Sequence, residues 1–507
     1  MDVLLTHAYF LAEDPHERAV MKPYPPLGIL YIAAHLEARG IAVRVFDTTF
    51  ATRDELAAVL ARERPPVVGI YVNLLTRASA LDLVRRAKQA GAIVVLGGPE
   101  PASYAARYLA HGADVVVAGE GELAMEELLA HFAARGLEGL EAVRGIVFSG
   151  ADGRPVTTPA RPAIPDLDAQ PWPARAAIDT GRYVDAWRRH HGRGSLSLIT
   201  ARGCPYECTW CSHGVFGYSH RRRSPANVAD ELASLVAAYR PDMVWYADDV
   251  FTINHRWLFA YAQELARRGL RLPFETITRE DRLDERVVAT LARMGCWRLW
   301  IGAESGSQRV LDAMKRRTDA ARVTAMVRLL RRHGIESGIF VMLGYEGEEP
   351  ADIEATVEHL QATRPDAFLT TVAYPIAGTP YHDAVRERLV ELKSWEEGSD
   401  RDVTVAGRRS RRYYGFATRW MVHEVARQRE AEKPRPDLLS VARHAVHARL
   451  GRLGMRLTES ELEPGAPAPA AAAARAPAPL GTAPPEAPTA EMPAEPPPLP
   501  ALDGAAP

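Results

Sequence analysis

Short apolar runs alternate with segments of helical periodicity along the first part of this 507-residue chain. Apolar residues at helical spacing first appear over residues 27–39, and similar segments follow each later apolar run. Such alternation predicts a parallel sheet covered by helices on both faces. Five strands predict a flavodoxin-like (Rossmann-like) α/β domain, which binds ligands beyond the carboxyl ends of its strands. The expected strands are residues 3–6, 43–46, 67–72, 93–96 and 115–118.

The same alternation resumes at Ser195, after a different kind of segment. Two apolar runs flank Gly150-Ala-Asp-Gly153 and predict a hairpin, and a proline-rich stretch after it predicts an extended linker. Six further strands predict a partial (β/α)6 barrel of TIM type, whose active site is built at the strands' carboxyl ends. These strands are expected at residues 196–200, 243–246, 274–278, 298–302, 337–343 and 367–373.

The last part of the chain changes character twice. Residues 384–462 are expected to be helical, at 385–392, 420–429 and 437–453. The third helix carries arginines beside leucines, which favours docking on the barrel and leaves a basic interfacial helix as the alternative. The alanine and proline that follow cannot form a core and predict disorder. The expected domains are 1–140, 141–194 (hairpin and linker), 195–383, 384–462 and 463–507.

Composition and charge narrow the function classes. A hydrophobic fraction of 47% and a charged fraction of 25% are ordinary for a globular protein. A net charge of −2 gives no global field that would recruit nucleic acid. We find no apolar run long enough for a transmembrane segment, and the N-terminus lacks the basic region of a signal peptide. The sequence therefore predicts a cytoplasmic protein whose thiols stay reduced.

Three of the four cysteines lie in one short stretch. Cys204, Cys208 and Cys211 have the spacing C-x3-C-x2-C. Three thiolates on one loop can converge on one metal centre, because thiolates are the soft ligands that iron–sulfur clusters and zinc prefer. Three ligands on a four-iron cube leave one iron free to bind a substrate or cofactor. A zinc site completed by His213 is the alternative, but structural zinc sites usually take paired ligands from two separated knuckles.

The cysteine spacing, with Trp210 before the third cysteine, resembles the cluster motif of the radical S-adenosylmethionine (SAM) superfamily. That resemblance implies a [4Fe–4S] cluster on the three cysteines, with SAM bound to the open iron and cleaved by reduction to a 5′-deoxyadenosyl radical. The segments 247–252, 302–306 and 338–344 also resemble their counterparts in the cobalamin-type members. The resemblance implies SAM contacts at Trp210, Asp249, Glu304, Ser305, Gly338 and Gly344.

The ends of the first five strands carry glycine-rich turns. Tyr24-Pro-Pro-Leu-Gly28, Gly97-Gly-Pro-Glu-Pro101 and Gly119-Glu-Gly-Glu122 resemble the cobalamin-binding domain that precedes many radical SAM barrels. The Asp-x-His-x-x-Gly motif of classical cobalamin domains does not occur, so cobalamin is expected without a protein histidine on cobalt. The resemblance implies cobalamin contacts at Tyr24, Pro26, Gly28, Asn73, Gly97, Gly98, Pro99, Gly119, Glu120 and Gly121.

Together these resemblances imply a cobalamin-dependent radical SAM enzyme that methylates an unactivated carbon of a small-molecule substrate. The electrons would come from an external donor such as a flavodoxin or ferredoxin. A ring-forming or rearranging enzyme, like the anaerobic magnesium-protoporphyrin ester cyclases, is the second hypothesis. A non-catalytic zinc-stabilised binding protein is the third. The sequence identifies neither the substrate nor a catalytic residue.

Overall fold

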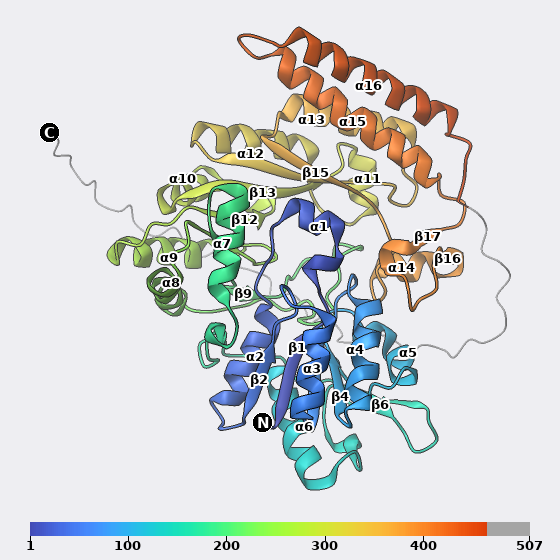
Figure 1. Ribbon diagram of the computed structural model, residues 1–507. Helices are drawn as coiled ribbons and strands as arrows, with labels where there is room; N and C mark the ends of the chain where they lie inside the picture. Colours follow the sequence, from blue (N-terminus) through green and yellow to red (C-terminus); the bar gives the residue numbers. More distant parts are fainter. Residues whose placement is uncertain (464–507) are drawn as a thin grey trace, which may run out of the picture. The chain divides into compact units, whose positions relative to one another are not determined.

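The computed structural model describes residues 1–463 (Figure 1). The tail that we predict to be disordered lies outside the described residues, except for Glu463. No helix within the described residues is long and apolar enough to cross a membrane.

The N-terminal domain contains a seven-stranded sheet with the order β2-β1-β3-β4-β5-β6-β7. The first five strands are parallel, as predicted. Its strands are β1 (Val3–His7), β2 (Val43–Phe46), β3 (Val67–Tyr71), β4 (Ile93–Gly97), β5 (Val115–Val117), β6 (Ile146–Ser149) and β7 (Pro155–Thr157). Its helices are α1 (Pro15–Val20), α2 (Leu27–Glu37), α3 (Arg53–Glu63), α4 (Arg77–Gln89), α5 (Ala105–Ala110) and α6 (Glu122–Arg135).

Helices cover both faces of this sheet (Figure 1). One buried core holds side chains of α3, α4 and α5, and the other holds those of α2 and α6. The hairpin β6–β7, which we placed in the connector, instead extends the sheet, because β6 pairs antiparallel with the free edge of β5. This pairing satisfies the backbone N–H and C=O groups along that edge of β5.

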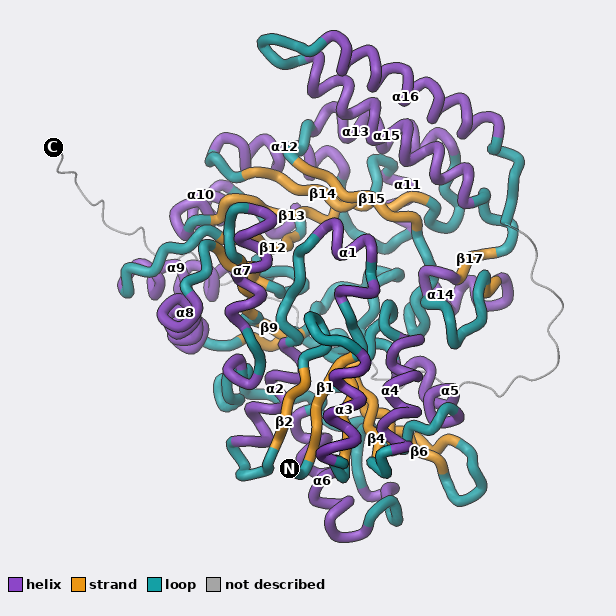
Figure 2. The backbone as a smooth tube through the Cα atoms, in the orientation of Figure 1, coloured by secondary structure: helices purple, strands orange, loops and turns teal. Residues whose placement is uncertain are grey.

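The second sheet has six parallel strands in the order β15-β14-β13-β12-β11-β8, which is the predicted partial barrel (Figure 2). A helix follows most strands and packs on the outer face. The strands are β8 (Ser195–Leu198), β11 (Met243–Tyr246), β12 (Phe274–Thr278), β13 (Cys296–Glu304), β14 (Glu336–Leu343) and β15 (Ala367–Val372). The helices are α7 (Thr180–His191), α8 (Pro225–Tyr239), α9 (His255–Arg267), α10 (Glu285–Met294), α11 (Gln308–Ala313), α12 (Ala320–Arg332) and α13 (Pro350–Thr363).

The C-terminal region is a small hairpin followed by two long helices. The helix expected at 385–392 is wrong: α14 (Pro380–Val385) ends there, and β16 (Leu389–Glu391) pairs with β17 (Val403–Val405). The helix expected at 420–429 is the longer α15 (Arg411–Ala431), which begins where Ser410 caps the Tyr413 amide at 3.2 Å. The last helix, α16 (Leu438–Leu457), lies alongside α15 (Figure 2).

Candidate active site

The cysteine loop leaves the barrel at the carboxyl end of β8. Two short strands, β9 (Ala201–Arg202) and β10 (Arg221–Arg222), pair antiparallel and close the loop at its base. Gly203 has a φ of +84°, and a Cβ there would lie 2.2 Å from the Ser219 carbonyl oxygen. Only glycine therefore allows the two legs of the loop to approach so closely.

Asp248 fixes the start of this loop. Its buried carboxylate, just after β11, accepts hydrogen bonds from the Thr200 amide at 2.7 Å and the Ala201 amide at 3.2 Å. Arg222 lies 3.3 Å from the same carboxylate. Asp248 therefore joins the ends of the first two barrel strands where the cysteine loop begins.

The three cysteine thiols are differently exposed but lie close together. Cys208 is buried, Cys204 is half-buried and Cys211 is exposed. Burial raises the pKa of Cys208 and of Cys204, that of Cys204 to about 11. The pKa of Cys211 is also raised, because removal of its thiol from water by the surrounding loop, although part of the residue stays exposed, adds to the negative charges of Cys208 and Glu304. Thiols with raised pKa values become thiolates when a metal replaces the proton.

These thiols fit an iron–sulfur cluster by donor type, and Cys204 and Cys208 are near enough to Cys211 for their charges to raise its pKa. Within residues 1–463, no three His, Cys, Asp or Glu side chains are already placed to hold a single metal ion. His213, the fourth ligand of the zinc alternative, stacks on Tyr218 with ring centroids 4.2 Å apart. Cys296, the fourth cysteine, is buried at the start of β13 in the barrel core.

Charged side chains surround the cysteines. Arg279 Nη1 lies 3.9 Å from Cys208 Sγ, and the negative charge of Asp249 raises the pKa of Cys204. Glu304 ends β13 with a φ of +63°, next to a register shift in the pairing with β14. Burial raises the pKa of Glu304 to about 8, against the opposing effect of Arg279. Non-glycine residues held at positive φ cluster at functional sites.

Three of the expected SAM residues also have packing roles within the chain. The Ser305 hydroxyl bonds Thr356 at 3.1 Å and accepts the Ser307 amide, which fixes a turn. Gly338 lies near the start of β14, and a Cβ there would collide with the Trp300 indole at 2.3 Å. This position agrees with the predicted strand, and the expected SAM contact of Gly338 stays a prediction. Gly344 does follow that end, with a φ of +75° and its missing side chain facing Tyr414.

Trp210 lies partly buried against a cluster of the barrel that includes Met314 and Tyr345. The adjacent Thr209 accepts the Tyr381 amide through its carbonyl, at 2.9 Å, and donates its own amide to Met314. The middle of the cysteine loop is thus attached to both α11 and α14.

The expected cobalamin residues lie at the carboxyl ends of the N-terminal strands. Gly97, the last residue of β4, has open space where a side chain would be, whereas a Cβ on Gly98 would meet the Val72 carbonyl oxygen at 2.3 Å. Gly121 packs against Ile32 of α2, and Asn73 Oδ1 accepts the Leu75 amide at 3.0 Å. The remaining members are Tyr24, which is 47% exposed, with Pro26 and Gly28 at the start of α2, and Pro99 and Gly119 beside the glycines above.

No histidine takes the place of the missing cobalt ligand at β1. His7 ends that strand, but its Nε2 lies 2.8 Å from Asp47 and its Nδ1 lies 3.1 Å from the Thr48 hydroxyl. Tyr183 of α7 donates to the same Asp47 at 2.7 Å. Both ring nitrogens of His7 therefore serve an internal network.

The strand ends of the two sheets meet at the cysteine loop. A Cβ on Gly214 would lie 3.0 Å from the Pro99 carbonyl oxygen, and one on Gly119 would lie 3.8 Å from the Val215 carbonyl oxygen. Arg202 bonds Glu120 at 2.7 Å and Glu122 at 2.6 Å, and all three side chains are nearly inaccessible. Arg221 reaches Glu120 as well, at 2.8 Å.

A second buried network was not predicted. Arg77, at the start of α4, bonds Glu100 at 2.7 Å and Asp400 at 2.8 Å. Asp400 also accepts the Tyr104 hydroxyl, and Trp395 packs on Tyr108 with ring centroids 5.0 Å apart. Glu100 belongs to the glycine-rich turn after β4, but its partners are distant in sequence and gave no signal.

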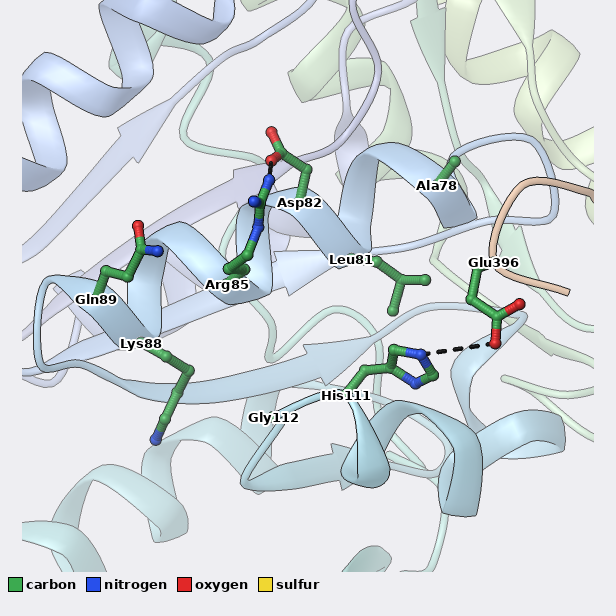
Figure 3. Close-up of a pocket in the computed structure, with 9 residues that line it drawn as sticks. All are labelled: Ala78, Leu81, Asp82, Arg85, Lys88, Gln89, His111, Gly112 and Glu396. Atoms are coloured by element: carbon green, nitrogen blue, oxygen red, sulfur yellow. Dashed lines mark hydrogen bonds and ion pairs between the residues drawn. The ribbon is translucent and has the colours of Figure 1, made fainter.

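A surface hollow of about 710 Å³ lies along α4, away from these features (Figure 3). Arg85, Lys88 and Asp82 line it on the helix, and at its other side His111 Nε2 lies 3.6 Å from Glu396 Oε1. None of its lining residues belongs to the cysteine loop or to the glycine-rich turns.

Comparison with known families agrees with this two-domain site. The B12 binding domain model matches residues 19–129, and the radical SAM superfamily model matches residues 198–360. The chain belongs to the radical SAM enzymes that carry a B12-binding domain. This radical SAM enzyme therefore uses a [4Fe–4S] cluster, SAM and cobalamin as cofactors.

Alignments with known relatives extend over most of this radical SAM enzyme's chain. An uncharacterised methyltransferase of Pyrococcus horikoshii is 26% identical over 76% of this chain and 84% of its own length. An anaerobic magnesium-protoporphyrin IX monomethyl ester cyclase of Rubrivivax gelatinosus is 27% identical over 68% of this chain, and the match spans 63% of that relative. The structure of the methyltransferase TsrM from Kitasatospora setae, with cobalamin and a [4Fe–4S] cluster bound, shares the fold with a TM-score of 0.64, 20% identity and 78% of each chain.

Proposed function

We propose that this radical SAM enzyme transfers a methyl group to an unactivated carbon. The observation that carries the proposal is the contact of Gly214 and Val215 with Pro99 and Gly119. Methyl transfer from cobalt to a substrate radical requires both cofactors to face one space. A cysteine loop that rests on the strand ends of the cobalamin domain meets this requirement.

The chain's own residues have distinct parts in this proposal. Cys204, Cys208 and Cys211 would hold the cluster, while Asp248 and Gly203 position their loop. When bound, the cluster and SAM supply the radical chemistry and the cobalamin supplies the methyl group. Glu304 and Asp249 flank the cysteines and are the carboxylates available to a SAM molecule there.

The inner face of the barrel sheet supports an apolar contact with the substrate. The outer faces of β13 and β14 pack in the core through Ile301 and Ile339. The alternate residues Trp300 and Phe340 stack on each other, 5.1 Å apart, and are only partly buried. Glu275 accepts the Trp300 indole N–H at 2.8 Å, which fixes the orientation of the Trp300 ring. We infer that these aromatic side chains contact an apolar part of the substrate.

The cofactors also imply an electron donor and a reducing compartment. The cluster must be reduced, so the enzyme would need an external electron donor such as a flavodoxin or ferredoxin. All four cysteines are free thiols. Free thiols and an oxygen-sensitive cluster suit the reducing cytoplasm.

The test uses anaerobically reconstituted enzyme with SAM that carries a trideuterated methyl group. The enzyme is incubated with a chemical reductant and a metabolite extract, and the products are analysed by mass spectrometry. Methyl transfer predicts a product heavier by one trideuterated methyl group, together with 5′-deoxyadenosine. The cyclase alternative, favoured by the Rubrivivax relative, predicts 5′-deoxyadenosine without label in the product. Cys208→Ser should abolish both signals.

A further inference from the structure

The helix α16 presents an exposed apolar stripe on the surface of the protein. Five aliphatic side chains at helical spacing are between 49% and 84% exposed, and they are not covered by any described part of the chain: Leu439, Val446, Leu450, Leu453 and Leu457. Leu438 adds a sixth, 73% exposed, at the tip of the hairpin with α15. Contiguous exposed leucines of this kind mark interaction surfaces.

The opposite face of α16 explains why the stripe remains outside. Ala448, Gly451, Gly454 and Met455 are the buried residues of the helix. A Cβ on Gly451 would lie 2.6 Å from the Trp420 backbone, so small residues bring α16 against α15. The face of α16 that packs on α15 is therefore formed by small residues and Met455. The large aliphatic side chains of the stripe take no part in that packing.

The charge of α16 indicates what covers the stripe. The helix contains four arginines and no aspartate or glutamate, although the whole chain has a net charge of −2. On the helix, Arg443 lies along one edge of the stripe, and Arg449 and Arg456 lie along the other. Arg452 instead pairs with Glu354 of α13.

We propose that α16 docks on an anionic lipid bilayer. The leucine stripe would enter the boundary between headgroups and acyl chains, and the flanking arginines would contact lipid phosphates. A second copy of the chain fits less well, because two such helices would bring arginines of like charge together without an acidic partner. The proposal is independent of the methyl-transfer function, since it concerns a surface that contains none of the candidate cofactor residues.

The experiment is co-sedimentation of the full-length protein with vesicles. One set contains equal parts of phosphatidylcholine and phosphatidylglycerol, and the other contains phosphatidylcholine alone. We expect binding to the anionic vesicles, weakened by salt and much weaker on the neutral ones. A stripe variant (Leu439→Gln, Leu450→Gln, Leu453→Gln) should bind about tenfold less or weaker still, and so should a charge variant (Arg443→Gln, Arg449→Gln, Arg456→Gln).

The matched control carries Leu137→Gln and Arg154→Gln, an exposed leucine and an exposed arginine of the N-terminal domain. It should bind like the wild type. Circular dichroism and iron content should be unchanged in all variants, because every altered side chain is exposed. The proposal is overturned if the wild type does not prefer anionic vesicles, or if a folded stripe variant binds as well as the wild type. It is also overturned if the stripe variant turns a dimer into a monomer, because the stripe would then cover a second copy.

Discussion

Substitutions at two adjacent glycines, Gly97 and Gly98, can distinguish an effect on cobalamin binding from an effect on the stability of the domain. A side chain on Gly97 would enter open space at the end of β4, and its φ is not positive. We therefore expect Gly97→Trp to fold normally, within about 0.5 kcal/mol of the wild type. Its indole would occupy the space in which the proposal places cobalamin.

Gly98 is different because the chain's own backbone requires it. Its φ is +113°, and a Cβ would lie 2.3 Å from the Val72 carbonyl oxygen. The dihedral alone costs a non-glycine residue about 1–3 kcal/mol. At roughly 2–4 °C per kcal/mol, Gly98→Ala should lower the melting temperature by at least several degrees once the clash is included.

Both variants are measured anaerobically for melting temperature, iron content and cobalamin absorbance after reconstitution. Gly97→Trp should keep its iron and melting temperature and lose cobalamin, whereas Gly98→Ala should melt early. Gly97→Ala is the matched control and should resemble the wild type in all three measurements. The reasoning is refuted if a well-folded Gly97→Trp takes up cobalamin fully, or if Gly98→Ala is as stable as the wild type.

Three other predictions follow from the described contacts. Arg202→Met should destabilise the protein by about 3–5 kcal/mol, because it leaves Glu122 buried without a partner. Thermal unfolding checks this, with Arg62→Met, which changes an exposed arginine, as the control. Equal melting temperatures of the two variants would contradict the prediction. Cys208→Ser should lose the iron that Cys296→Ser retains, because Cys296 lies in the barrel core; iron assays of the two purified variants decide. Burial, His447, His444 and nearby arginines lower the pKa of His423 on α15, so the unfolded chain binds more protons than the folded one. Stability should therefore be full above the ordinary histidine pKa of about 6.5 and fall as the pH drops below it; His423→Gln should flatten this dependence of the melting temperature.

Local signals in the sequence predicted the two sheets and the position of the cysteine loop. Strand periodicity and the spacing of Cys204, Cys208 and Cys211 are properties of short segments, so both can be recognised without the fold. Long-range contacts could not be predicted in this way. Arg202 and Glu122 are 80 positions apart, and Arg77 and Asp400 are 323 apart. From the sequence, a glycine such as Gly338, which admits the Trp300 ring, cannot be told apart from a glycine that admits a ligand.

In the glycine-rich turns, the acidic side chains and the glycine backbone have different roles. Glu100, Glu120 and Glu122 all come from turns that resemble cobalamin-binding segments, yet each carboxylate is buried on an arginine. Arg202 and Arg221 lie at the base of the cysteine loop, and Arg77 connects α4 to Asp400 near the C-terminal hairpin. Glu120 and Glu122 therefore hold the two domains together directly, whereas Glu100 binds the arginine that reaches Asp400. The glycines between them remain free to let a large ligand approach the backbone, so substitution of a glutamate should disturb the domain contact first and cobalamin binding only as a consequence.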